Sequence, residues 1–192
     1  MQLQPLSLGI LAFFLGSIPF SLIVSKLKGV DLRNIGSGNL GATNVYRAMG
    51  WKYAFVVFLL DAIKGYIPTH LALNHNDPLL HILIGFMAIL GHSLTPFARF
   101  KGGKGAATGL GVLMAISPDV CGILIVVASL LIYFTRYVAP VTLLCSVLAL
   151  ILLWFFHYPS EYGITVSLIS LFIVYRHKAN IIRLIQGKEN RL

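Results

Sequence analysis

The sequence is short of charged residues, and acidic residues are the scarcest of them. Asp, Glu, Lys and Arg make up 11% of the 192 residues, whereas a soluble domain carries about 25%. Hydrophobic residues make up 57%, so the chain lacks the polar surface that a soluble fold of this length needs. The composition therefore predicts an all-α polytopic membrane protein, formed by residues 1–192 as a single domain.

Cysteine is also scarce, and its placement excludes several kinds of chemistry. Cys121 and Cys145 both lie inside apolar runs, where they are expected to be small buried side chains rather than a disulfide. No His and Cys residues have metal-ligand spacing, so we predict no metal and no cofactor. The N-terminus has neither a basic segment nor an Ala-x-Ala site, so the first apolar run is expected to be a membrane span rather than a cleaved signal.

The net charge is +9, which by itself would fit a nucleic-acid-binding protein. The basic residues are not gathered on a soluble face, however, because they lie between apolar runs. Membrane lipid headgroups and a phosphorylated substrate are therefore the expected partners, and nucleic acid is not.

Apolar runs between polar breaks predict seven transmembrane helices. Their expected ranges are Pro5–Ser25, Tyr53–Leu73, Leu79–Phe97, Ala106–Ile116, Val120–Thr135, Val138–Phe156 and Tyr162–Tyr175.

The breaks alternate in charge. Every Lys and Arg except Lys64 follows an odd-numbered span, whereas the breaks at 74–78, 117–119 and 157–161 contain acidic residues and no Lys or Arg. Basic loops remain in the cytoplasm, so we expect the N-terminus outside and the C-terminus in the cytoplasm. The fourth and seventh spans are shorter than a bilayer of about 30 Å requires. Their cytoplasmic ends are expected to be recessed into a polar pocket.

The first polar cluster follows the first span and contains Ser37, Asn39, Thr43, Asn44 and Arg47 among Gly36, Gly38 and Gly41. The glycine spacing formally matches a dinucleotide fingerprint, but a membrane span precedes it and no βαβ unit follows. Glycine amides combined with amide, hydroxyl and guanidinium donors favour an anion-binding loop instead.

The second cluster precedes the fourth span and contains Gly102, Gly103, Lys104 and Gly105. It lacks the Ser or Thr of a P-loop. Lys104 stands between glycines where a helix is expected to open, and free amides at a helix start attract an anion. Lys101 fits ordinary interfacial anchoring.

The third cluster lies at 175–183, where we expect the seventh span to continue as a helix. Its arginines and lysine fit a basic end of a membrane helix. His177 and Asn180, spaced i, i+3, are not needed for that purpose and are predicted to be functional. Asp61 and Lys64 lie inside the second span, where they are either functional or an internal ion pair. For His92, a packing role is favoured over a catalytic one.

Taken together, the three clusters resemble one family. Gly-Ser-Gly-Asn-x-Gly-Ala-Thr-Asn-x-x-Arg, then Gly-His followed by Phe-Lys-Gly-Gly-Lys-Gly, then Tyr-Arg-His-x-x-Asn-Ile-x-Arg-Leu are similar to motifs of the bacterial acyl-phosphate-dependent glycerol-3-phosphate acyltransferases. The resemblance implies transfer of an acyl group from acyl phosphate to the sn-1 hydroxyl of glycerol 3-phosphate, the first step of phospholipid synthesis.

The resemblance also implies roles for particular residues. The phosphates would be held by Ser37, Arg47, Lys104, His177 and Asn180, with Gly102, Gly103 and Gly105 admitting the donor and Gly38, Asn39, Gly41, Thr43 and Asn44 shaping the acceptor loop. No histidine has Asp at the fifth following position, so the His-x4-Asp base of other acyltransferases is missing. The enzyme is expected in the bacterial inner membrane, with its active site on the cytoplasmic side and no obligatory protein partner. The alternative is a transporter of an organic phosphate.

Overall fold

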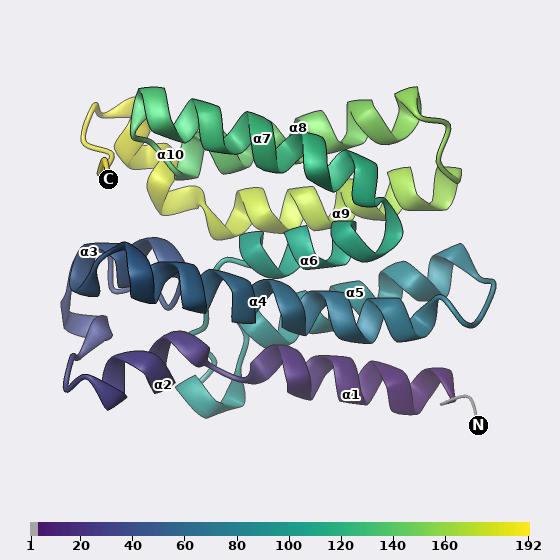
Figure 1. Cartoon of the computed structure of the whole chain (residues 1–192), viewed down its shortest axis with the longest axis horizontal. Helices are drawn as coiled ribbons and strands as arrows, with labels where there is room; N and C mark the ends of the chain where they lie inside the picture. The colour runs from purple at the N-terminus through teal and green to yellow at the C-terminus, as the bar shows by residue number, and fades with distance from the viewer. Residues whose placement is uncertain (1–3) are drawn as a thin grey trace. The chain divides into compact units, whose positions relative to one another are not determined.

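The computed structural model describes residues 4–192, except for the side chain of Thr165, and within that range it is helical with no strand (Figure 1). The chain divides into two compact units, Met1–Ile116 and Ser117–Leu192, and each is described by itself. The all-α prediction is confirmed for the described residues.

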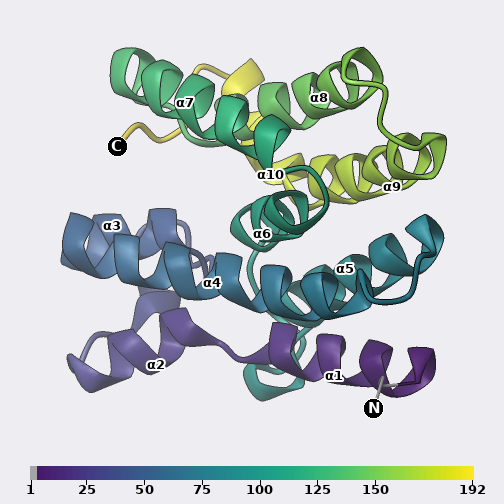
Figure 2. The same ribbon diagram turned by 45° about the vertical axis from the view of Figure 1, so that its right-hand side comes forward.

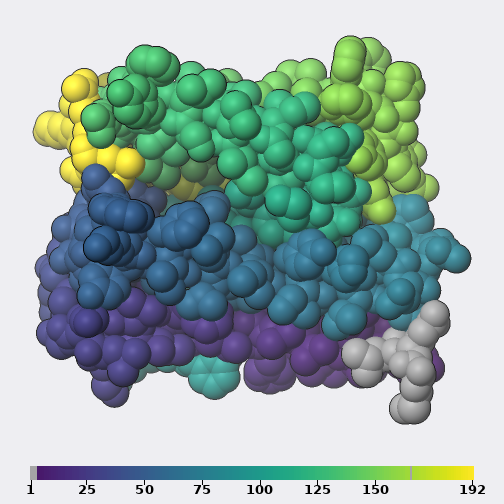
Figure 3. Space-filling view, in the orientation of Figure 1, coloured from purple at the N-terminus to yellow at the C-terminus, as the bar shows by residue number. Residues whose placement is uncertain are grey.

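The first unit holds the first two polar clusters. Its helices are α1 (Pro5–Ser17), α2 (Phe20–Leu27), α3 (Ala42–Met49), α4 (Trp51–Ala72), α5 (Pro78–Ser93) and α6 (Ala106–Ile116). Helices α1, α4 and α5 lie side by side, and α6 packs on α4 (Figures 1 and 2). The space-filling view shows α1 lying directly against α4 (Figure 3).

The second unit holds the third cluster. Its helices are α7 (Pro118–Thr135), α8 (Ala139–Phe155), α9 (Ser160–Arg176) and α10 (Lys178–Ile185). At one end the Tyr158 hydroxyl donates to Asp119 Oδ1 over 2.5 Å. Burial of the phenol and this bond raise the pKa of Tyr158 to about 12, so the phenol keeps its proton and the bond connects the start of α7 to the turn before α9.

The helices match the predicted spans closely. Among the described residues, four segments are long and apolar enough to cross a membrane: Pro5–Leu27, Trp51–Ala72, Pro78–Ala98 and Pro118–Thr135. Helices α6 and α8 are apolar but shorter, and α9 occupies the place of the seventh predicted span. The number of spans, seven, and the orientation of the termini stay predictions.

The first predicted span is not one continuous helix. Helix α1 ends at Ser17, Ile18 is extended with ψ 116°, and α2 begins after Pro19. Proline has no amide hydrogen to donate and disfavours helical backbone in the residue before it, which explains the break. The predicted first span, Pro5–Ser25, therefore consists of two helices within one apolar segment, Pro5–Leu27, that is long enough to cross a membrane.

Glycines allow α4 and α6 to approach until their backbones touch. A Cβ atom at Gly65 would overlap the carbonyl oxygen of Thr108, and one at Gly111 would overlap that of Ala62. Small residues at such contacts are typical of membrane helix pairs, where van der Waals packing replaces the hydrophobic effect as the driving force. These contacts position the start of α6, and with it Lys104.

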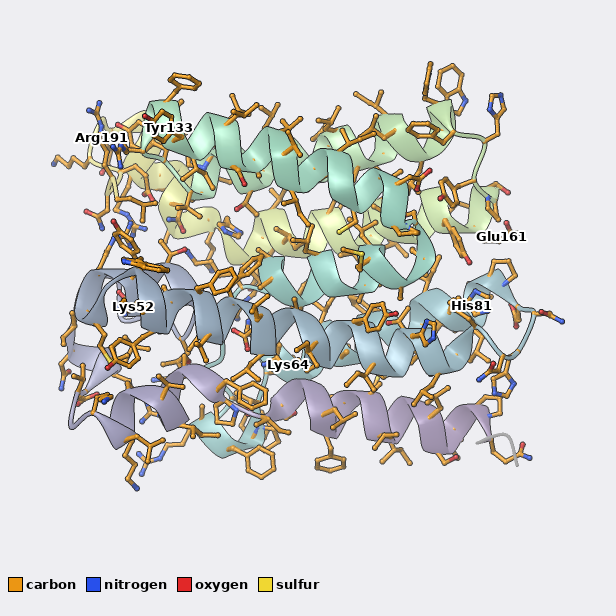
Figure 4. All side chains as sticks on the ribbon, viewed as in Figure 1. Lys52, Lys64, His81, Tyr133, Glu161 and Arg191 are labelled. Atoms are coloured by element: carbon orange, nitrogen blue, oxygen red, sulfur yellow. The ribbon has the colours of Figure 1, made fainter. Side chains whose placement is uncertain are left out.

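Lys52 and His81 lie at opposite ends of the first unit, and Arg191 and Glu161 lie at opposite ends of the second (Figure 4). The first polar cluster lies at the Lys52 end, because α3 directly precedes α4.

Gly111→Ala is expected to lower the thermal stability of the protein in detergent, because the new methyl group would separate α6 from α4. Overpacking of this kind costs about 1–3 kcal/mol. Gly122→Ala is the matched control, since Gly122 lies inside α7 and nothing comes within 4 Å of the added Cβ. Tryptophan fluorescence during heating measures both, and equal melting temperatures for the two variants would contradict the packing argument.

Candidate active site

The first cluster is a tight loop followed by a short helix. Gly36 has φ 58° and Gly38 has φ 66°, a left-handed conformation that glycine adopts without steric cost. Gly41 precedes α3, which carries Thr43, Asn44 and Arg47. The sequence prediction placed these three residues in a loop, and the structure corrects it because α3 begins at Ala42.

Asn44 lies at the centre of this cluster and is buried, with 1% of its surface exposed. Its Oδ1 accepts from the backbone N–H of Ser37 at 3.0 Å and from the Ser37 hydroxyl at 3.4 Å. Its Nδ2 donates to the carbonyl oxygens of Leu32 and Ile35, both at 3.0 Å. An amide bonded on both sides in this way sets the loop path, so Asn44 holds Ser37 in place.

Arg47 lies next to the same loop. Its Cδ is 3.5 Å from where a Cβ atom of residue 36 would lie, so its side chain passes directly over Gly36. Ser37 is exposed and Arg47 is half-buried. The first cluster therefore presents a hydroxyl and a guanidinium on one small surface, as phosphate binding requires.

The second cluster folds back onto the last turn of α5. Gly102 N–H donates to the carbonyl of Ser93 at 3.1 Å, and Gly103 N–H donates to that of His92 at 3.2 Å. The N–H groups of these two glycines, which were predicted to admit the donor substrate, are therefore bonded to the protein's own backbone. A Cβ atom at Gly103 would also lie 2.8 Å from the carbonyl oxygen of Leu40. The first and second clusters therefore touch at this point.

Lys104 follows directly and is half-buried. Gly105 has φ 88°, and α6 begins at Ala106, as the sequence predicted to within one residue. The ammonium group is therefore carried at a helix start, where backbone amides and the helix dipole add positive potential.

The helix that runs through the third cluster is interrupted, which the sequence did not indicate. Helix α9 ends at Arg176 and α10 begins at Lys178, with His177 at the junction. The prediction that 175–183 forms one continuous helix is therefore wrong. His177 and Asn180 are both buried, and the Asn180 N–H donates to the His177 carbonyl at 2.8 Å, so the two predicted residues are adjacent in space.

Glu189 is a residue that the sequence interpretation missed. Its Oε1 accepts from Asn180 Nδ2 at 2.6 Å, and its Oε2 accepts from Arg183 Nε at 2.9 Å. The C-terminal tail therefore folds back to orient the Asn180 amide. A signal was present, because Glu189 is an isolated acid within the strongly basic C-terminal segment.

The structure thus forms two groups of predicted residues, one in each unit. Ser37, Arg47 and the Lys104 loop belong to the first, and His177 with Asn180 to the second. Within residues 4–192, no three His, Cys, Asp or Glu side chains come close enough to hold a metal ion.

The fold and the clusters define an all-helical integral membrane protein with residues suited to phosphate. A family model described as glycerol-3-phosphate acyltransferase matches residues 6–187. The glycerol-3-phosphate acyltransferase of Aquifex aeolicus is 43% identical over 191 residues, covering 98% of this chain and 100% of that protein. The chain belongs to the glycerol-3-phosphate acyltransferase family.

Solved structures support the same assignment. A crystal structure of PlsY (YgiH), an integral membrane glycerol 3-phosphate acyltransferase in its glycerol 3-phosphate form, is 43% identical, with a TM-score of 0.94, covering 98% of this chain and 95% of that one. A lysophosphatidic acid form of PlsY is 41% identical, with a TM-score of 0.92 and the same coverage.

Asn44→Asp tests the role assigned to the buried amide. The substitution keeps an acceptor for Ser37 but places a carboxylate oxygen against the carbonyls of Leu32 and Ile35, where an N–H stood. We expect kcat/KM to fall by about 10–100-fold, as displacement of a reacting group does. Asn34→Asp is the control for added charge, since Asn34 lies in the same connection between α2 and α3 but is exposed and has no role in the proposed site. Activity of Asn44→Asp equal to the control would contradict the role of Asn44.

Proposed function

We propose that this glycerol-3-phosphate acyltransferase takes its acyl group from an acyl phosphate and transfers it to the sn-1 hydroxyl of glycerol 3-phosphate. The products are lysophosphatidic acid and inorganic phosphate. The observation that supports this proposal most directly is the contact between the first and second clusters at Gly103 and Leu40. Each cluster has the residue types that bind phosphate, and both substrates bear a phosphate. The glycerol 3-phosphate and lysophosphatidic acid forms of the related PlsY agree with this acceptor and product.

The proposed roles follow from the chemistry of each side chain. Arg47 offers a planar pair of donors, and Lys104 offers a point charge at a helix start, so both would bind phosphate. Ser37 would donate its hydroxyl to a phosphate oxygen. Asn180, oriented by Glu189, would act with His177 on the same substrates.

The supporting residues are proposed to shape the site rather than to react. Asn44 holds the first loop, and the Gly102–Gly103 backbone is held against α5. The remaining members of this group are Gly38, Asn39, Gly41, Thr43 and Gly105.

The reaction needs no protein nucleophile. Acyl phosphate is a mixed anhydride, so the acceptor hydroxyl attacks the acyl carbon directly and phosphate leaves with the electrons of the broken C–O bond. Lys104 and the surrounding donors would stabilise the negative charge that develops on the carbonyl oxygen and on the leaving phosphate. Catalysis would then consist of positioning and electrostatics.

The proton of the attacking hydroxyl must be accepted by a base, and we propose His177. Its Nδ1 lies 2.8 Å from the carbonyl oxygen of Ile173. A carbonyl only accepts, so Nδ1 carries the proton and Nε2 of the neutral ring carries the lone pair. This is the tautomer that a general base requires. A phosphate oxygen of the substrate is the alternative acceptor.

The location of the reaction is proposed from charge. The basic ends of the helices would face the cytoplasm, which puts the three clusters on the cytoplasmic side of the bacterial inner membrane. Seven spans would leave the N-terminus outside, and residues 1–192 would act as one domain without a cofactor or an obligatory protein partner.

A three-donor assay tests the donor. Purified protein is incubated with labelled glycerol 3-phosphate and either acyl phosphate, acyl-CoA or acyl carrier protein. We expect labelled lysophosphatidic acid from acyl phosphate alone, and Lys104→Ala should lower its formation about 100-fold or more because leaving-group charge loses its partner. Lys101→Ala is the matched control, since Lys101 is exposed in the same loop.

Product from acyl-CoA would reassign the donor. Uptake of unchanged glycerol 3-phosphate into sealed vesicles, without any product, would favour a transporter instead.

Replacing His177 tests the base. His177→Gln is expected to lower kcat about 100-fold or more while leaving both KM values within a few-fold, because proton transfer contributes about 10²–10⁴-fold. Steady-state kinetics at several pH values measures this. Near-normal kcat in both His177→Gln and His177→Ala would assign the proton to a substrate phosphate oxygen.

A further inference from the structure

The proposed reaction makes no use of the charged residues buried inside the first unit. Asp61 and Lys64 are 2% and 4% exposed, and Lys64 Nζ lies 2.8 Å from Asp61 Oδ1. Charges in an apolar interior are costly unless they are paired, which explains why these two residues lie together. His92 on α5 is the third ionisable group of the cluster, with 6% of its surface exposed.

The hydrogen bonds of Lys64 serve the fold. Its Nζ also donates to the carbonyl of Ile18 at 3.0 Å, and it lies 5.7 Å from the centre of the Phe20 ring. At the break before Pro19 the Ile18 carbonyl accepts from the Phe20 N–H at 3.1 Å in place of the usual helical donor, and Lys64 supplies a second hydrogen bond. Figure 4 shows Lys64 on α4 near this break. Lys64 therefore stabilises the junction of α1 and α2.

His92 contacts the same carboxylate from another helix. Its Nδ1 lies 3.6 Å from Asp61 Oδ1, an electrostatic contact longer than a well-formed hydrogen bond. A carboxylate can only accept, so its field favours the tautomer with the proton on Nδ1 and the lone pair on Nε2. The same arrangement orients histidine rings in many protein sites.

The opposite edge of the His92 ring lies against the second cluster. A Cβ atom at Gly103 would overlap Nε2 and lie 2.6 Å from Cε1. The backbone of His92 also accepts the Gly103 N–H, so both the ring and the carbonyl of one residue hold this glycine. Lys104 is the next residue in the chain.

We propose that His92, oriented by Asp61, is a positioning residue that sets the Gly102–Gly103 backbone and thereby the placement of Lys104. The His92 ring contacts the Asp61 carboxylate of the buried ion pair at one edge and the Gly103 backbone of the proposed phosphate-binding loop at the other. It explains why position 103 is glycine without invoking the substrate, because a larger residue would collide with the ring. The proposal rests on the phosphate-binding role proposed above for Lys104.

Two substitutions at His92 distinguish the contact of Nδ1 with Asp61 from the contact of Nε2 with Gly103. Glutamine places its amide near the position of Nε2 and keeps a group beside Gly103. Asparagine places its amide near Nδ1 and keeps only the contact with Asp61. The KM values for acyl phosphate and for glycerol 3-phosphate, and kcat, are measured separately for each purified full-length variant.

We expect His92→Asn to lower kcat/KM for acyl phosphate by about 10–100-fold, as displacement of a group near the reacting atoms does. His92→Gln should lower the same kcat/KM by about threefold or less, because its amide still fills the place of Nε2 beside Gly103. Equal losses of kcat/KM in the two variants would overturn the proposal. His81→Asn and His81→Gln are matched controls, because His81 is equally buried on α5 at its far end, and both should leave kcat/KM unchanged.

The tautomer of His92 supplies a second test, which needs no variant and no turnover. Gly91–His92 is the only Gly–His pair in the sequence, so ¹³C-glycine with ¹⁵N-histidine labelling identifies this residue by NMR. The expected ¹⁵N shifts are those of a protonated Nδ1 and an unprotonated Nε2. A ring protonated on Nε2, or on both nitrogens, would overturn the proposal.

The two proposals fail in different ways. If the wild-type protein uses acyl-CoA instead of acyl phosphate, the proposed donor is wrong, while the His92 tautomer and the kcat/KM values of the two His92 variants for that donor still test the positioning role. If acyl phosphate is the donor but the Asn and Gln variants behave alike, only the positioning role is wrong.

Discussion

The buried contact between Asp61 and Lys64 is the interaction on which the first unit depends. A helix interrupted inside an apolar layer needs donors for the carbonyls it leaves open. Lys64 donates to Ile18, and the Thr95 hydroxyl donates to the Ser17 carbonyl at 2.5 Å. Helix α4 and the loop after α5 therefore stabilise the break in α1–α2, and Asp61 balances the charge that this requires.

Both phosphate-type loops of the first unit are held by the protein's own polar groups. Asn44 bonds to the first loop on both of its faces, and the carbonyls of His92 and Ser93 accept the amides of the second. A loop whose backbone is already bonded does not need to be ordered again when substrate binds. Arg47 and Lys104 are thus carried on segments whose backbone is already held in place, which is what the proposed catalysis by positioning requires.

The sequence allowed the helices to be placed because hydrophobic length and breaks are local properties. The ranges of α4 and α6 agree with prediction to within a few residues, and α6 begins beside Lys104 as expected. The sequence ranges did not show where two of the predicted helices are interrupted: Pro19 separates α1 from α2, and His177 separates α9 from α10. Proline was a visible signal for the first interruption, whereas no residue type in the sequence marked the second.

By itself, the sequence determined that the protein is helical and integral to the membrane, and that its polar clusters follow the basic ends of the helices. It also indicated the family, since the clusters are contiguous motifs. Only the tertiary structure decided which polar residues support the others. Asn44, His92 and Glu189 act through partners 7 to 31 positions away in the chain, at Ser37, Asp61 and Asn180. Such pairs form only where packed helices and folded loops bring their atoms within a few ångströms, and composition and periodicity carry no information about that distance.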